Sequence, residues 1–216
     1  MTIHIIITML LLLAFLIGSI WFAKKKYQIN LAVLGLGAVA FFVSSQILEK
    51  LVHILILHPQ KDGSIALLQD HPLIYIIYGL GHGGLELIFL GLISLLNLYI
   101  VLSAVQTQNP QVMQLLSENM LKTIQSLSVW QIYLLGFERI LALGFQLLLT
   151  VWVYQAVRQK KWIYLLAAYG LHAFFDLAPS LFQVGWLTNP VLVEVILALE
   201  IVLVAYGTKE IFCKKS

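Results

Sequence analysis

The sequence predicts an all-α fold, a polytopic bundle of membrane-spanning helices that forms one transmembrane domain over residues 1–216. Of the 216 residues, 61% are hydrophobic and only 11% are charged, whereas about a quarter of a soluble domain is charged. The apolar runs are about 20 residues long, as a helix needs to cross a bilayer. They do not alternate polar and apolar residues as the strands of a membrane barrel do. Composition therefore indicates an integral membrane protein built from helices.

Hydropathy predicts six spans, and local signals support the ends of two of them. The first apolar run has no basic segment before it and no small-residue cleavage site after it, so we expect a retained helix rather than a secretory signal. The last span has a good start signal, Asn189 followed by Pro190, because proline suits the first turn of a helix. The predicted spans cover residues 3–23, 28–48, 73–105, 130–157, 161–180 and 190–207.

Basic residues predict how the chain is oriented. The formal net charge of +3 comes from small clusters just beyond apolar runs, at 24–26, 158–161 and 209–215. Such clusters are typical of cytoplasmic flanks. They predict an N-terminus outside, a C-terminus in the cytoplasm, the lipid bilayer as the surroundings, and no nucleic-acid partner.

This orientation requires an odd number of crossings, which six simple spans do not provide. The run 73–105 is 33 residues long, about 50 Å as one helix, against a hydrocarbon core of roughly 30 Å. The segment "YGLGHGGLELIF" at 78–89 contains four glycines between 79 and 84. We therefore expect a break at these glycines and a re-entrant piece over about 65–82, or a seventh span.

Polar groups interrupt the apolar spans at three places. The three constellations are His82 with Glu86, Glu138 with Arg139, and His172 with Asp176. The first and third have i, i+4 spacing, which places both side chains on one helix face. Each group would cost several kcal/mol if it faced lipid, so a shared interior cavity is predicted.

Several uses of these groups are open at this level. Histidine and carboxylate together suit acid–base work on a water molecule, metal ligation, or a proton path. A single buried polar residue can also simply form a hydrogen bond between helices. Glu194 and Glu200, six residues apart on the last span, are expected on different faces, solvated or bonded between helices.

Four segments together resemble a known family. They are "AFFVSSQ" (40–46), "GLGHGGLE" (79–86), "FERILALGF" (137–145) and "HAFFD" (172–176). In this order they resemble the YhfC-like membrane peptidases. That family is placed with the glutamic-type CAAX prenyl proteases, the bacteriocin-processing enzymes and the PrsW-like proteins. The resemblance implies a helical hydrolase of a bacterial cell membrane that cleaves a membrane-embedded peptide or protein.

The resemblance also implies roles for individual residues. It assigns the activation of water to His82, Glu86, Glu138 and His172, and a supporting role to Arg139, Gln146 and Asp176. A glutamic-type enzyme needs no cofactor. If a divalent metal such as zinc takes part, the implied ligands are His82, Glu138 and His172.

Two departures from the family pattern leave other functions open. The EExxxR motif that precedes GHGG in the family has no counterpart here, and Gln146 stands where the family usually has a histidine. Glutamine forms hydrogen bonds but does not take up a proton. The alternatives are a catalytically inactive relative that binds a membrane peptide, as an immunity-type protein would, and a small transporter or proton path.

Overall fold

The computed structural model describes residues 1–27, 34, 35, 38 and 74–213. Helices and short turns make up these residues, and no strand occurs among them, which confirms the predicted all-α class. The elements are α1 (Thr2–Tyr27), α4 (Ile74–Glu86), the π-helical η3 (Leu87–Leu92), α5 (Ile93–Gln106), α6 (Pro110–Met113), α7 (Glu118–Ser126), α8 (Val129–Gln159), α9 (Trp162–Phe175), α10 (Leu177–Gln183), α11 (Pro190–Thr208) and η4 (Lys209–Cys213).

Within the described residues, five helical stretches are long and apolar enough to cross a membrane. They are Thr2–Lys26, Ile76–Gln106, Val129–Gln159, Trp162–Gln183 and Pro190–Phe212. These stretches correspond to five of the six predicted spans. The remaining one, 28–48, lies outside the described residues except at 34, 35 and 38. The chain is an integral membrane protein.

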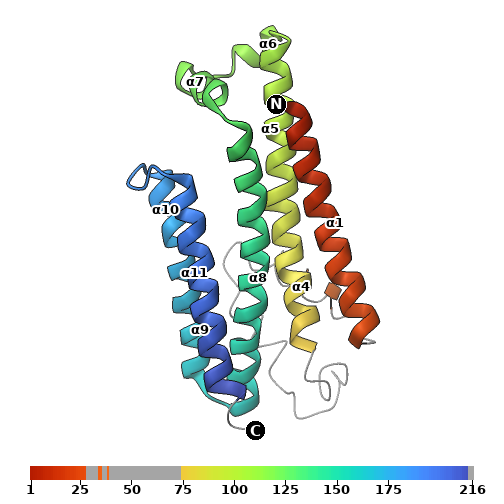
Figure 1. Ribbon diagram of the computed structural model, residues 1–216, viewed down its shortest axis with the longest axis vertical. Coiled ribbons are helices and arrows are strands. Elements are labelled where there is room, and N and C mark those ends of the chain that lie inside the picture. The colour runs from red at the N-terminus through yellow and green to blue at the C-terminus, as the bar shows by residue number, and fades with distance from the viewer. Residues whose placement is uncertain (28–33, 36–37, 39–73, 214–216) are drawn as a thin grey trace.

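The central element is α8, with α1, α4 and α5 on one side and α9, α10 and α11 on the other (Figure 1). It packs directly against α1, α4, α9 and α11. Two apolar cores result, one that includes Ile5, Tyr78 and Ile132 and a second that includes Phe145 and Leu197. Side chains on α8 can therefore meet groups from both halves of the bundle.

Local sequence signals determine where α8 and α11 begin. The hydroxyl of Ser128 accepts a hydrogen bond from the backbone N–H of Gln131, whose side-chain oxygen accepts one from the N–H of Ser128. This reciprocal pair satisfies two N–H groups that a helix start leaves open. Asn189 Oδ1 accepts from the N–H of Val191 at the start of α11, so the predicted start at Asn189 and Pro190 is confirmed.

The predicted break at the glycines is wrong. α4 runs unbroken through residues 79–84 and continues through η3 into α5, so one long helix extends from 74 to 106. No re-entrant turn occurs over the described part of the predicted 65–82 piece, and 65–73 lie outside the described residues.

The glycines instead serve as contact points of α4. A Cβ atom on Gly79 would lie 2.9 Å from Thr150 Oγ1, and one on Gly83 would lie 2.7 Å from Leu143 Cδ1 and 3.0 Å from Gln146 Cβ. These two glycines, four residues apart, face α8. Small residues at this spacing let membrane helices approach closely, so the glycines bring α4 against the middle of α8.

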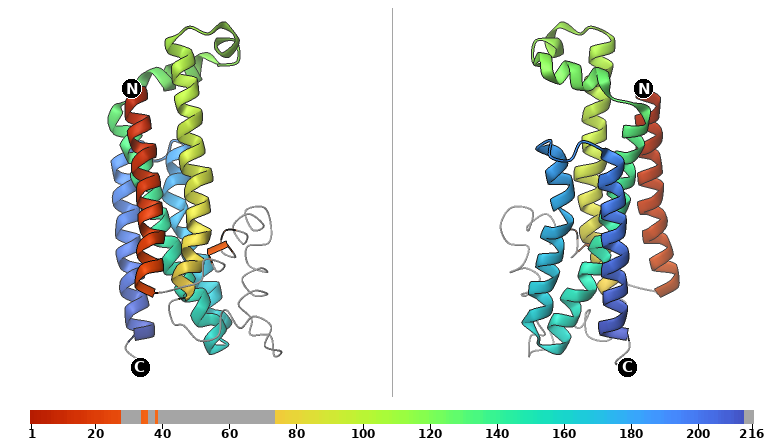
Figure 2. Two further views of the ribbon diagram at one scale, coloured as in Figure 1. Left: turned by 90° about the vertical axis from the view of Figure 1, so that its right-hand side faces the viewer. Right: turned by 60° about the vertical axis from the view of Figure 1, so that its left-hand side comes forward.

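The chain termini lie at opposite ends of the bundle (Figure 1). The N-terminus is at the end where α6 and α7 connect α5 to α8, as Figure 2 also shows. Opposite ends are the arrangement that an odd number of crossings produces. Which end faces the cytoplasm stays a prediction from the basic clusters.

Candidate functional site

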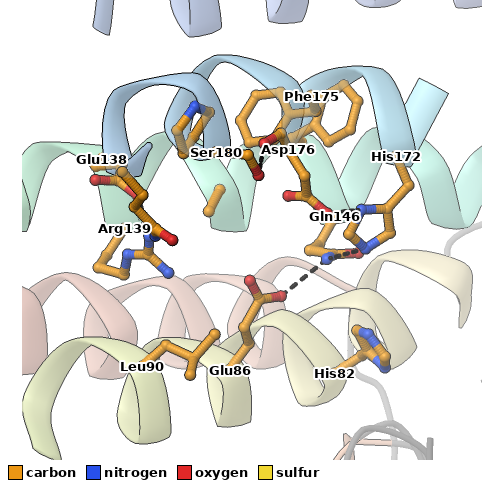
Figure 3. Close-up of a pocket in the computed structure, with 14 residues that line it drawn as sticks. His82, Glu86, Leu90, Glu138, Arg139, Gln146, His172, Phe175, Asp176 and Ser180 are labelled. Atoms are coloured by element: carbon orange, nitrogen blue, oxygen red, sulfur yellow. Dashed lines mark hydrogen bonds and ion pairs between the residues drawn. The ribbon is translucent and has the colours of Figure 1, made fainter. Parts of the chain in front are cut away.

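A cavity of about 400 Å³ lies among α4, η3, α8, α9 and α10. Each of the seven candidate residues lines it: His82, Glu86, Glu138, Arg139, Gln146, His172 and Asp176. They come from three separate spans, and Figure 3 shows them around one space. The structure thus brings the three polar constellations to a shared interior cavity, while their catalytic roles stay predictions.

The cavity lies at mid-depth in the bundle. Gln146 follows Val129, the first residue of α8, by 17 residues and precedes Gln159, the last, by 13. At 1.5 Å per residue these separations correspond to about 25 Å and 20 Å along the helix. At such a depth, polar groups are satisfied by other protein groups or by a water-filled cavity rather than by lipid.

A chain of polar contacts joins three helices across the cavity. Gln146 Nε2 on α8 donates a hydrogen bond to Glu86 Oε2 on α4 at 2.8 Å and lies 3.2 Å from His172 Nε2 on α9. His172 Nδ1 lies 3.1 Å from Asp176 Oδ2. Figure 3 shows Glu86 and His172 pointing toward Gln146 from opposite walls.

One protonation pattern satisfies all three contacts. The NH₂ group of Gln146 has two hydrogens, one for the Glu86 carboxylate and one for His172 Nε2. His172 Nε2 then accepts, so its proton is on Nδ1 and points to Asp176. This tautomer is inferred from the hydrogen-bond network. Gln146 therefore has a definite place in the site, where it orients a carboxylate and an imidazole at once.

Aromatic packing holds together two of the helices that carry these polar groups. The rings of Phe145 and Phe175 stack with centroids 4.0 Å apart and planes at 9°. Phe145 precedes Gln146 and Phe175 precedes Asp176 in sequence, so the stack holds α9 against α8 beside both polar residues. The sequence contains no signal for this pairing, because it depends on which faces of the two helices meet.

Glu138 and Arg139 form an ion pair with each other at the cavity wall. Both side chains are largely buried, with exposed fractions of 17% and 20%. A Cβ atom on Gly91 would lie 3.1 Å from Arg139 Cγ, so η3 packs against the arginine stem. The carboxylate of Glu138 is thus neutralised by its neighbour, whereas Glu86 receives a neutral amide donor.

His82 is the most buried of the candidate residues, with 3% of its surface exposed. It precedes Glu86 by one helical turn on α4 and lines the same cavity. Its position next to Gly81 and Gly83, both in close contact with other parts of the chain, leaves it little freedom to move.

The predicted metal ligands do not form a metal site. Among the described residues, no group of three or more His, Cys, Asp or Glu side chains is arranged to hold an ion. Glu138 is paired with Arg139, and His172 makes its contacts with an amide and with Asp176. A zinc ligand set needs three or four donors around one point, and the described residues alone do not provide one.

Glu194 and Glu200 correct the expectation that the carboxylates of the last span are solvated or bonded between helices. They are buried, with 7% and 8% of their surface exposed, and the Oε2 atom of each has no hydrogen-bond partner among the described residues. Glu194 lines a second cavity of about 240 Å³, next to the first. Residue spacing did not reveal this, because burial on α11 depends on how α8 and α10 cover it.

Comparisons with known proteins agree with the site's sequence motifs. The family described as YhfC intramembrane metalloprotease matches residues 8–80 and 78–197. The chain is also similar to the "Uncharacterized membrane protein YhfC" of Bacillus subtilis (strain 168), with 30% identity over 233 residues and 88% of each chain covered. No solved structure matches.

Proposed function

Because the chain belongs to the YhfC intramembrane metalloprotease family, we propose that it hydrolyses a peptide bond of a membrane-embedded peptide, with Glu86 as the base that activates water. The observation that carries this proposal is the Glu86 carboxylate held by Gln146 at the wall of a cavity at mid-depth in the bundle. The likeness to a bacterial membrane protein also supports placing the chain in a bacterial cell membrane.

Glu86 suits the role of base better than Glu138. Gln146 holds only Oε2 of Glu86, which leaves Oε1 for a water molecule in the cavity. Glu138 already shares its charge with Arg139, whereas Glu86 forms no ion pair with the described residues and is held by an amide. The choice between the two carboxylates thus rests on their partners, which the sequence did not distinguish.

In the proposed reaction, a water molecule attacks the carbonyl carbon of the peptide while Glu86 accepts one of the water's protons. The carbonyl oxygen becomes an oxyanion, which the nearby Arg139 stabilises by hydrogen bonding and charge. His172 accepts from Gln146 and so fixes the amide that holds Glu86. The C–N bond then breaks, and the proton on Glu86 passes to the leaving nitrogen. Gln146 and Asp176 position Glu86 and His172 throughout.

The mechanism uses no metal step, although the family's description names one, because the described side chains do not form a ligand set. We therefore expect cleavage to persist in 1,10-phenanthroline. The assay reconstitutes the purified protein in liposomes with a single-span peptide that carries a fluorophore and a quencher, and follows fluorescence with and without the chelator. Loss of cleavage that zinc restores would contradict the mechanism. Peptide binding without any cleavage would instead indicate the inactive, peptide-binding relative.

Asp176→Asn is expected to lower kcat by about 10- to 100-fold, the usual effect of losing a carboxylate that orients a functional histidine. An asparagine amide can present its NH₂ to His172 Nδ1, which would move the ring proton to Nε2, opposite the NH₂ of Gln146. The same liposome assay measures kcat, and thermal unfolding verifies that the variant folds. An unchanged kcat would show that the His172–Asp176 contact of 3.1 Å has no part in the reaction.

A further inference from the structure

The second cavity adjoins the proposed active site and extends toward one end of the bundle. Glu138, Pro179 and Gln183 line both cavities. The second one also reaches Leu127 and Pro190, near the starts of α8 and α11, which lie toward the same end (Figure 1). The two cavities therefore adjoin each other at these three residues.

The distinguishing feature of the second cavity is Glu194. Its walls are mainly apolar, with Leu134, Leu135, Phe182 and Val193 among them. Glu194 is 93% buried, since its exposed fraction is 7%, and its Oε2 has no hydrogen-bond partner among the described residues. A carboxylate without a partner in apolar surroundings is costly.

Glu138 does not share this feature, although it faces the same cavity. Arg139 already compensates its charge, whereas the described residues form no ion pair or hydrogen bond with Glu194. Glu194 is thus a buried carboxyl group of the second cavity for which the described residues provide neither an ion pair nor a hydrogen bond.

We propose that the Glu194 cavity binds a primary ammonium group carried on an apolar chain. An ammonium is a compact point charge on a flexible stem, which suits one carboxylate oxygen in a narrow apolar space; a guanidinium would require a planar, bidentate partner. Resting on the proposed function, the ligand is the lysine side chain of a membrane-embedded substrate. The same chemistry is present in the headgroup of phosphatidylethanolamine.

Peptide binding to the full-length Glu86→Gln protein tests this site without requiring cleavage. The probes are fluorescent, apolar peptides that each cross the membrane once. Each peptide carries a single lysine at one central position, and its counterpart carries norleucine at the same position; the position is varied from peptide to peptide. Binding is measured in phosphatidylglycerol liposomes. We expect the best-placed lysine peptide to bind at least about tenfold more tightly than its norleucine counterpart, the range for a buried charge pair. Adding Glu194→Gln should remove this preference, and adding Glu200→Gln, a matched buried carboxylate outside the cavity, should keep it.

Phosphatidylethanolamine in the liposomes distinguishes the two sources of the ammonium. If the lipid headgroup occupies the cavity, added phosphatidylethanolamine weakens the binding of the lysine peptide; if only peptide lysine does, binding stays the same. Equal affinity for lysine and norleucine peptides with no effect of the lipid would overturn the proposal, as would a lysine preference that survives Glu194→Gln.

The outcome is separable from that of the proposed function. Wild-type protein that cleaves both peptides equally well would overturn the ammonium site and leave the peptidase in place. If the wild-type protein cleaves neither peptide but prefers the lysine peptide in a way that depends on Glu194, the ammonium site is supported and the peptidase proposal is overturned. Glu194→Asp keeps the charge and should retain part of the preference for the lysine peptide. It replaces Glu194→Gln as the test variant if Glu194→Gln does not fold.

Discussion

Glu86→Gln is expected to reduce kcat for peptide cleavage in liposomes by about 10²- to 10⁴-fold, the usual contribution of a general base. Glutamine has nearly the same shape and can still accept the hydrogen bond from Gln146 through its side-chain oxygen. It cannot take the proton from water. The variant should therefore bind peptide as well as the wild type and fail in the chemical step, which single-turnover kinetics would separate.

Glu200→Gln is the matched control for this experiment. It removes another buried carboxylate from the membrane interior, but one that lines neither cavity. Its kcat should remain within a few-fold of wild type. If Glu86→Gln also cleaves at a rate within about tenfold of wild type, below the range for a general base, Glu86 is not the base, and Glu138→Gln becomes the next variant to measure.

Gly83→Leu is expected to destabilise the fold by about 1–3 kcal/mol or more, the cost of overpacking a close contact. A Cβ atom at this position already comes within 3.0 Å of Gln146 Cβ, so a full leucine side chain must push α4 away from α8. Because Glu86 is on α4, its hydrogen bond with Gln146 should be lost with the contact. A lower thermal midpoint in detergent and reduced cleavage in liposomes are the expected results.

Gly144→Leu provides the comparison, since a Cβ atom there meets no atom of the described residues within 4 Å. It makes the same change within α8, two residues from Gln146, and should leave the thermal midpoint close to that of wild type. The smaller change Gly83→Ala should fall between the two. Equal midpoints for Gly83→Leu and Gly144→Leu would mean that α4 and α8 do not pack through this glycine.

Much of the candidate site could be predicted because its signals are local in sequence. The spacing of His82 with Glu86, and of His172 with Asp176, is set by one helical turn. The high cost of a charge in lipid then predicts that such pairs face a common interior. The seven predicted residues accordingly line one cavity. Gln146, which departs from the family pattern, lies between Glu86 and His172.

The sequence by itself determined that this protein is a helical membrane protein and which polar residues its interior must accommodate, because length, hydropathy and helical periodicity are properties of single segments. Only the tertiary structure decided that the glycines of α4 are contacts with α8 rather than a break, that Arg139 pairs with Glu138 while Gln146 holds Glu86, and that Glu194 is buried at a second cavity. These outcomes depend on which helix faces meet, and no single segment encodes its neighbours.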